Sequence, residues 1–295
     1  MTPDYPQTTD PSISSIGGKP SSKKSIAELE AIARQMRKDI VTMVFKAGSG
    51  HPGGSLSAAD IVAALYFRVM HHDPLNLSMD DRDRFILSKG HASPVIYAAL
   101  ARSGYFPVDD LWTFRKSGSH LQGHTDALMT PGIELTTGSI GMGLSYGVGV
   151  SLAGKMDGKP YHTFVVVGDG ESDEGSIWEA AASANHLKLG NITAIIDRNR
   201  MQNDGFSADI MNMEPYPDKW KAFGWETWEI DGHNMSQVVE SLEKARMPRN
   251  HPHPIAIVAH TTKGKGVSFM ENNPDWHGKA PSAEQHKQAM EELSK

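Results

Sequence analysis

The sequence contains no cysteine. Disulfide frameworks, cysteine-ligated zinc or iron–sulfur sites and thiol nucleophiles are therefore excluded. It also lacks a run of 18 apolar residues and an apolar stretch near its N-terminus, so neither a membrane span nor a secretory signal is predicted. The net charge of −6 is spread without a basic block, which argues against binding to nucleic acid or to a membrane surface. We expect a soluble cytoplasmic protein.

What the chain does have is the composition of a globular protein. Its 295 residues are 39% hydrophobic and 22% charged, which is enough to fill the core of one large α/β domain. Residues 1–24 are instead rich in Ser, Thr, Pro, Gly and Lys, and we predict a flexible tail there. Ser25 and Glu28 have the spacing of a helix capping box. The folded domain is therefore predicted to cover residues 25–295.

Three near-continuous apolar runs predict buried strands, at residues 163–167, 192–196 and 255–259. Such runs are typical of a parallel sheet that is covered on both faces. A helical pattern over residues 174–187 joins the first two runs into a βαβ unit. Further helices are predicted over residues 25–48, 57–70, 93–102 and 283–294. The predicted fold class is α/β, a single domain with a mostly parallel central sheet and helices on both faces.

A G-D-G motif, Gly168-Asp169-Gly170, follows the first predicted strand. Glycines at the carboxyl end of a strand let backbone amides approach a diphosphate, and the following helix N-terminus favours negative charge. A carboxylate would repel phosphate, so a divalent cation between the two is expected. Asn199 lies 30 positions after Asp169, beyond the next strand, and its amide oxygen would suit Mg²⁺ or Ca²⁺. The tripeptide alone fits a tight turn equally well.

The G-D-G motif with Asn199 resembles the thiamine diphosphate fingerprint, and further motifs resemble the transketolase family. Several motifs in register are far more specific than any one of them, and they run in the family's order from residue 48 to residue 278. They are Ser49-Gly50-His51-Pro52-Gly53, Leu87-Ser88-Lys89-Gly90-His91, Gly123-His124, Thr136-Thr137-Gly138-Ser139-Ile140-Gly141, Glu174-Gly175, Glu179-Ala180, His186-Leu187, Asn203-Asp204-Gly205 and His277-Gly278.

This resemblance implies a diphosphate-binding domain that uses thiamine diphosphate and Mg²⁺, with Ca²⁺ or Mn²⁺ as substitutes. The implied metal ligands are the side chains of Asp169 and Asn199 and the carbonyl of Met201. The implied cofactor contacts come from nine residues: His91, Gly138, Ile140, Gly168, Asp169, Gly170, Glu171, Asn199 and His277. Glu174 and Glu179 are implied to lie at a subunit interface, although a solvated helix face is the alternative for both.

Four histidines are implied to be catalytic: His51, His91, His124 and His277. Each of them neighbours a glycine, where backbone and ligand can come close. On spacing alone each would fit a structural role. Neutral imidazole can donate or accept a proton near pH 7, which the cleavage of a C–C bond beside a carbonyl requires. By the resemblance, His51 and His277 face the reacting hydroxyl and the developing oxyanion, His91 the diphosphate, and His124 the C1 hydroxyl.

The family's full-length enzymes are longer, and this chain resembles their first domain. The resemblance implies one subunit of a split transketolase, which transfers a two-carbon glycolaldehyde unit from a ketose, usually phosphorylated, to an aldose. The expected partner is a second subunit with the pyrimidine-binding and C-terminal domains, with two copies of each chain in a heterotetramer. Related thiamine enzymes, such as deoxyxylulose-phosphate synthase or dihydroxyacetone synthase, and a non-catalytic regulatory homologue are the alternatives. The sugars stay open, including those of the pentose phosphate pathway and apiose-derived or sulfonated ones.

Overall fold

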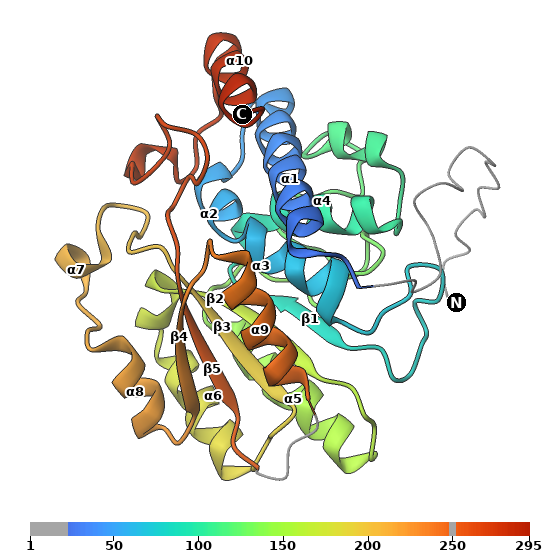
Figure 1. The fold of residues 1–295 in the computed structure, drawn as a ribbon, viewed down its shortest axis with the longest axis vertical. Helices are drawn as coiled ribbons and strands as arrows, with labels where there is room; N and C mark the ends of the chain where they lie inside the picture. Colours follow the sequence, from blue (N-terminus) through green and yellow to red (C-terminus); the bar gives the residue numbers. More distant parts are fainter. Residues whose placement is uncertain (1–22, 248–251) are drawn as a thin grey trace.

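The computed structural model describes residues 23–247 and 252–295. A five-stranded sheet in the order β1-β2-β3-β5-β4 lies at its centre, and every neighbouring pair is parallel (Figure 1). The predicted parallel sheet is therefore confirmed. Its strands are β1 (Arg84–Leu87), β2 (Thr163–Gly168), β3 (Ile192–Arg198), β4 (Glu226–Asp231) and β5 (Ile255–His260).

Both faces of the sheet are covered, as the near-continuous apolar runs predict. Side chains alternate along a strand, so Phe164 and Val166 of β2 enter one hydrophobic core while Val165 and Val167 enter the other. All four are fully buried. The helices that cover the two faces exclude water from the middle of the sheet, and this leaves the ends of the strands as the accessible part.

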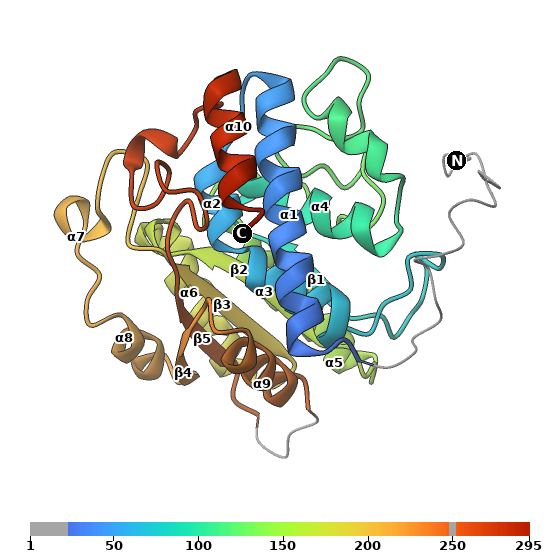
Figure 2. The ribbon, with the colours of Figure 1, turned by 45° about the horizontal axis from the view of Figure 1, so that its top comes forward.

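The core that contains Phe164 and Val166 is closed by helices α1, α2, α3, α4 and α9, and α10 packs beside α1 (Figures 1 and 2). The opposite core is closed by α5, α6 and α8. The bounds are α1 (Ile26–Ala47), α2 (Pro52–Ser57), α3 (Ala59–Ala64), α4 (Ser93–Ser103), α5 (Met142–Met156), α6 (Gly175–His186), α7 (Ser207–Ile210), α8 (Tyr216–Ala222), α9 (Met235–Arg246) and α10 (Ala283–Glu292). A π-helical turn spans Leu65–Val69, and 3-10 turns span Gly90–Ala92, Val108–Thr113, Gly170–Asp173 and Pro274–Trp276.

The capping box that the sequence predicts is present at the start of α1. The Ser25 hydroxyl accepts from the Glu28 amide, and the Glu28 carboxylate accepts from the Ser25 amide. Of the predicted flexible tail, residues 1–22 lie outside the described part of the chain. Lys23, which is described, forms an ion pair with Glu243 of α9, with an N–O distance of 2.8 Å.

The prediction of one helix over residues 57–70 is wrong in its start and in its continuity. The helical segment begins earlier, at Pro52, which occupies the first turn of α2. It is divided into α2, α3 and the π-helical turn. Gly53 and Gly54 lower the helix propensity of this segment, but close packing requires a small residue here. A Cβ on Gly53 would lie 2.9 Å from the Trp276 carbonyl oxygen.

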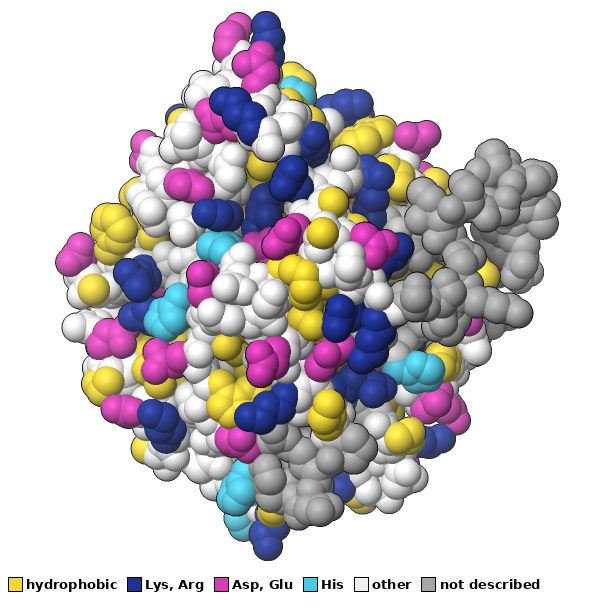
Figure 3. Space-filling model, in the orientation of Figure 1, with side chains coloured by type: hydrophobic (Ala, Val, Ile, Leu, Met, Phe, Trp, Pro, Cys, Tyr) yellow, Lys and Arg dark blue, Asp and Glu magenta, His cyan; other side chains and the backbone are white. Residues whose placement is uncertain are grey.

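Acidic and basic side chains are interspersed over the face of the molecule shown in Figure 3, without a large area of one sign. None of the helices in the described ranges is both long enough and apolar enough to cross a bilayer.

Candidate active site

Charged and polar side chains gather where the parallel strands end. Lys89 and His91 follow β1, Asp169 follows β2, Asn199 follows β3 and Lys263 follows β5. The register pairs Gly168 of β2 with Asp197 of β3, so their carboxyl ends are level. Open α/β sheets bind ligands at this edge because loops from several strands converge there.

The structure brings the four predicted catalytic histidines together. The ring centroids of His91 and His277 are 5.0 Å apart, and those of His51 and His91 are 5.3 Å apart. His51 also lies 5.5 Å from His277 and 6.1 Å from His124. These four residues, which we call the histidine cluster, come from the N-cap of α2, the turn after β1, the loop before α5 and the segment after Trp276.

Burial makes the histidine cluster neutral at pH 7. It lowers the pKa of His51 to about 4, with further contributions from the positive charges of Arg115 and Lys263. It lowers the pKa of His277 to about 3, where Lys263 is the next cause. The pKa values of His91 and His124 are lowered as well, first by burial. A neutral imidazole has one donor and one acceptor nitrogen, so each ring can exchange a proton with a bound hydroxyl group.

Two nearly inaccessible lysines flank the cluster, and the motifs in the sequence predict a role for neither. Lys89 and Lys263 are each 2% exposed. The Lys89 ammonium donates to the Gly54 carbonyl at 2.7 Å and pairs with the Asp197 carboxylate. The Lys263 ammonium donates to the Gln202 carbonyl at 2.9 Å and to Nδ1 of His277 at 2.8 Å. A lysine beside a glycine, a few residues after a predicted buried strand, is the signal that could have identified Lys263.

Lys263 differs from Lys89 because, within residues 23–247 and 252–295, no carboxylate lies at ion-pair distance from it. Burial lowers its pKa to about 8. A buried ammonium without a counter-ion is costly, and it is a natural partner for an anionic group such as a diphosphate.

Asp169 and Asn199, the predicted metal ligands, lie side by side and are 6% and 5% exposed. Asp169 accepts from the amides of Gly170 at 2.9 Å and Arg200 at 2.6 Å. Burial and the nearby Asp197 carboxylate raise the pKa of Asp169 to about 6. The Asn199 side-chain oxygen accepts from the amide of Met201 at 3.2 Å. Asp169 Oδ1 and the Asn199 side-chain oxygen each accept one hydrogen bond, whereas Asp169 Oδ2 also lies 3.5 Å from the Ser207 hydroxyl. No group of three His, Asp or Glu side chains suited to a metal occurs in the described part of the chain.

The Glu171 carboxylate, a predicted cofactor contact, is used by donors of the chain itself. It accepts from the amide of Gly141 at 2.8 Å, from the amide of Gly168 at 2.9 Å and from the Ser88 hydroxyl. The two backbone amides donate to different oxygens of the carboxylate, which favours its ionised form, whereas burial raises its pKa. Glu171 thus joins the end of β1, the end of β2 and the start of α5, and its contact with a cofactor stays a prediction.

Four further predicted residues are Gly138, Ile140, Glu174 and Glu179. Gly138 faces the His124 ring, because a Cβ on this glycine would lie 3.6 Å from the ring. Ile140 is 37% exposed, and Glu174 and Glu179 are exposed at the N-cap and on the surface of α6. Their exposure is compatible with the predicted subunit interface, which stays a prediction.

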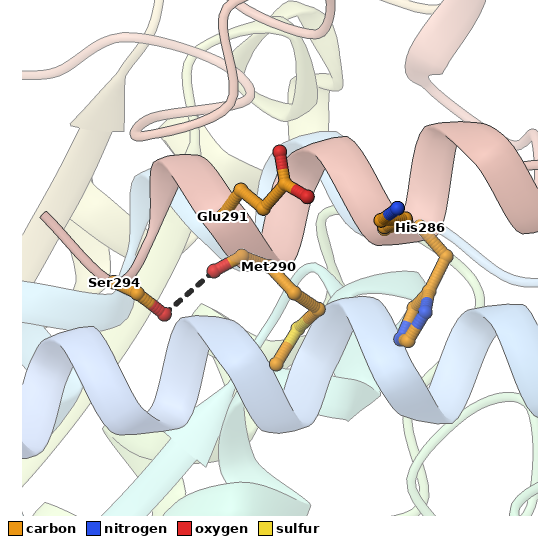
Figure 4. Close-up of a pocket in the computed structure, with 5 residues that line it drawn as sticks. His286, Met290, Glu291 and Ser294 are labelled. Atoms are coloured by element: carbon orange, nitrogen blue, oxygen red, sulfur yellow. Dashed lines mark hydrogen bonds between the residues drawn. The ribbon is translucent and has the colours of Figure 1, made fainter.

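A cavity of about 190 Å³ is lined by Asp169 and in part by Arg198, Arg200 and Tyr216, and by no residue of the histidine cluster. A second, open depression lies on α10, where His286 and Met290 are directed toward α1 (Figure 4). The His286 ring stacks on Phe45 at 4.3 Å, so this histidine has a packing role. None of the predicted site residues lines the depression on α10.

Residues 29–294 match the family described as "Transketolase, thiamine diphosphate binding domain". The chain belongs to the transketolase family. Among curated relatives, the 6-deoxy-6-sulfo-D-fructose transketolase subunit SqwG of Clostridium sp. is 46% identical over 91% of this chain and 97% of its own length. One of the subunits of the apulose-4-phosphate transketolase of Phocaeicola vulgatus is 42% identical over 91% of this chain and 95% of its own.

Solved transketolases share the fold. The transketolase from Campylobacter jejuni superimposes with a TM-score of 0.85 at 33% identity over 92% of this chain, and that from Leishmania mexicana with 0.85 at 30% over 93%. The chain covers 43% and 42% of these two transketolase chains. The likeness to the transketolase family therefore extends over this whole domain and over less than half of the solved enzymes.

The site's own chemistry fits thiamine diphosphate. Lys263 offers a buried positive charge without a counter-ion, and Nδ1 of His51 is buried without a hydrogen-bond partner in the described chain. Gly54 and Gly168 lie beside Lys89, since a Cβ on either would be in ordinary contact with that side chain, at 3.7 and 3.8 Å. Buried ammonium groups beside glycine backbone are suited to a diphosphate.

Proposed function

We propose that this chain is the diphosphate-binding subunit of a two-chain transketolase, which transfers a two-carbon unit from a ketose to an aldose. The observation that carries the proposal is the histidine cluster, in which the His51 ring lies 5.3 to 6.1 Å from each of the other three rings, beside two buried lysines. Neutral imidazoles suit sugar hydroxyl groups, and ammonium groups suit a diphosphate.

The cofactor would be held through its diphosphate and a divalent cation. Lys263 would neutralise part of the diphosphate charge, with the ion-paired Lys89 nearby, and the backbone around Gly168 would approach it closely. Asp169, Asn199 and the Met201 carbonyl would bind Mg²⁺, with Ca²⁺ or Mn²⁺ as substitutes. Only one of these ligands is a carboxylate, so phosphate oxygens would complete the coordination, which is usual for Mg²⁺. Thiamine diphosphate supplies the nucleophilic carbon and the electron sink for breaking a C–C bond beside a carbonyl.

Proton transfer would be the task of the histidine cluster. The Lys263 ammonium donates to Nδ1 of His277, so the ring proton of His277 resides on Nε2 and can be donated to an oxygen. We assign to His277 and His51 the stabilisation of negative charge on the carbonyl oxygen and the removal of the C3 hydroxyl proton. His91 and His124 would position the diphosphate and the C1 hydroxyl.

The partner we propose is a second transketolase subunit, which would carry the pyrimidine-binding and C-terminal domains. Two relatives that match this chain over nearly their full length are named as transketolase subunits. Met142 and Tyr146, one helical turn apart on α5, are 52% and 44% exposed near Glu174. An exposed apolar face beside an active site favours a protein contact. We propose two copies of each chain.

The sugars would be selected largely by the second subunit. The two relatives carry names with different substrates, a sulfonated fructose and apulose 4-phosphate, at 46% and 42% identity to this chain. A ketose with a modified or phosphorylated terminal carbon is therefore the substrate class to examine first.

The test is a two-carbon transfer assay on the purified chain, alone and with the co-encoded second subunit, with thiamine diphosphate and Mg²⁺. We expect turnover only from the pair, with the donor panel covering sulfonated, apiose-derived and ordinary phosphorylated ketoses. Asp169→Ala should abolish activity. Turnover by the chain alone would contradict the two-chain proposal, and a pair that binds the cofactor without transferring any of these sugars would favour a related thiamine enzyme or a regulatory homologue.

The contact between the subunits has its own test. Met142→Glu should weaken association with the second subunit, because it places a charge on the apolar face of α5, and should leave the thermal unfolding of the isolated chain unchanged. Met156→Glu, at a position on the same helix that is 77% exposed, is the matched control. Equal association of both variants, measured by analytical ultracentrifugation, would remove this face from the proposed interface.

A further inference from the structure

A second group of charged residues lies outside the histidine cluster and links α1, α3 and the loop after β5. Arg37 of α1 and Asp60 of α3 form a two-pronged ion pair, with N–O distances of 3.0 and 2.6 Å. Nδ1 of His233 lies 2.8 Å from the same Asp60 carboxylate. Nε2 of His233 lies 2.8 Å from the amide nitrogen of Thr262. We call these four residues the His233 relay.

The partners of His233 define its tautomer. A backbone amide only donates, so Nε2 must accept from Thr262 and carries no proton. The proton is therefore on Nδ1, which donates to Asp60. The Arg37 fork holds Asp60 in place, and both side chains are 9% exposed. Burial alone would raise the pKa of Asp60, but Arg37 and His233 lower it, so Asp60 is ionised and accepts from both.

The relay holds the peptide group between Thr261 and Thr262, because the Thr262 amide belongs to that group. The Thr261 hydroxyl donates to Asp197, the Thr262 amide donates to His233, and the Lys263 ammonium donates to Nδ1 of His277. Three consecutive residues are thus hydrogen-bonded to three different parts of the fold. The bond from the Thr262 amide acts with neighbouring backbone bonds, since the Gly264 amide donates to the Gly53 carbonyl and the Lys263 carbonyl accepts from the Asn272 amide.

We propose that His233 is a positioning residue: through the Thr262 amide it holds the Lys263 ammonium on His277 and in place for the diphosphate. The inference rests on the proposed function for its catalytic consequence, but not for the backbone contact itself. Residues that orient a ligand-binding group from behind commonly contribute factors of about 10 to 100 in affinity or rate. His233 would act through Lys263 and touch neither cofactor nor sugar.

The test compares two amide substitutions that differ only in reach. His233→Asn keeps a donor near Nδ1 for Asp60 but is too short to accept from Thr262. His233→Gln can donate to Asp60 and accept from Thr262. The matched control is His72→Asn, because His72 likewise joins a side chain, Tyr105, to a backbone group, the Tyr66 carbonyl, in a loop away from the site.

Two readouts separate positioning from general destabilisation. The first is hydrogen exchange of residues 261–264 in the isolated chain, which needs no activity. The second is the dissociation constant of thiamine diphosphate, with kcat and the sugar KM, in the complex with the second subunit. We expect His233→Asn to speed exchange of this segment and to weaken cofactor binding about tenfold or more with little change in the sugar KM. His233→Gln should restore most of the slow exchange and most of the cofactor affinity, and His72→Asn should change neither quantity.

The proposal is overturned if His233→Asn exchanges residues 261–264 at the wild-type rate, if its cofactor affinity stays within twofold, or if His72→Asn causes an equal loss. It is also overturned if His233→Gln behaves like His233→Asn, since the acceptor would then be irrelevant. Absence of turnover from the wild-type complex would refute the proposed function instead, and the exchange data would still decide the role of His233.

Discussion

Replacement of the two buried lysines by methionine should have unequal effects on stability. Lys89 neutralises Asp197, and the two side chains are 3% and 0% exposed. Lys89→Met would leave a buried carboxylate without its counter-ion, which costs about 3 to 5 kcal/mol. Lys263 has no such counter-ion, and the fall of its pKa from 10.5 to about 8 means that its charge already costs on the order of 3 kcal/mol at pH 7. Lys263→Met removes this cost together with two hydrogen bonds worth about 1 kcal/mol each.

Urea unfolding of the isolated chain measures this difference. Lys89→Met should lose about 3 to 5 kcal/mol of unfolding free energy, and Lys263→Met should stay within about 1 to 2 kcal/mol of the wild type. Both variants should bind thiamine diphosphate more weakly, because each loses an ammonium group near the diphosphate.

The pH dependence of the unfolding free energy tests the same reasoning for Lys263. Its pKa is lower in the folded than in the unfolded chain, so the unfolded chain binds more protons between about pH 8 and 10.5. The wild type should therefore gain stability relative to Lys263→Met as the pH rises from about 8. Equal losses of stability in the two methionine variants at pH 7, or a difference between wild type and Lys263→Met that is independent of pH, would refute the account.

Three further predictions concern the strand ends. Gly90→Ala should destabilise the chain by about 1 to 3 kcal/mol in urea unfolding, because its Cβ would lie 2.3 Å from the Thr137 hydroxyl, whereas Gly175→Ala, with nothing within 4 Å, should be neutral. Mg²⁺ affinity, measured by calorimetry on the complex, should fall about fourfold between pH 7.5 and 5.5, because a carboxyl with a pKa of about 6 is mostly protonated at the lower pH. The Asp169→Asn variant should bind Mg²⁺ too weakly to show this pH dependence. An unchanged wild-type affinity would exclude Asp169 as the titrating ligand. Glu171→Gln should lower the unfolding free energy by about 1 to 3 kcal/mol, since an amide cannot accept from all three donors; a wild-type value would mean that the carboxyl is protonated.

The long buried strands could be predicted from the sequence because they are apolar on both faces. β1 could not, since it has only four residues and begins with an arginine. β4 lies at the edge of the sheet and is partly exposed along its whole length, so it lacks an apolar run. The full length of α5 could not be predicted either, because its glycines lower helix propensity. They are tolerated there by close packing, and a Cβ on Gly147 would lie 2.6 Å from Val165.

The histidine cluster could be predicted because each histidine belongs to a motif that resembles a known family. Lys89 belongs to one of these motifs as well, but composition predicts a lysine to be exposed, and only the strand order shows that it meets Asp197. Glu171 illustrates the reverse case. Its place after the G-D-G motif suggests a ligand contact, whereas its carboxylate is surrounded by three donors of the chain.

The pairing of His51 with His277 also bears on when the site comes into existence during synthesis. Their rings are 5.5 Å apart although 226 positions separate them in the chain. A chain still on the ribosome can build β1, β2 and β3, yet it offers only part of the pocket until the segment after β5 has emerged and returned to α2. Such long-range closure is slow compared with local folding. Cofactor capture would therefore report on complete folding, and a truncated or stalled chain would not sequester thiamine diphosphate.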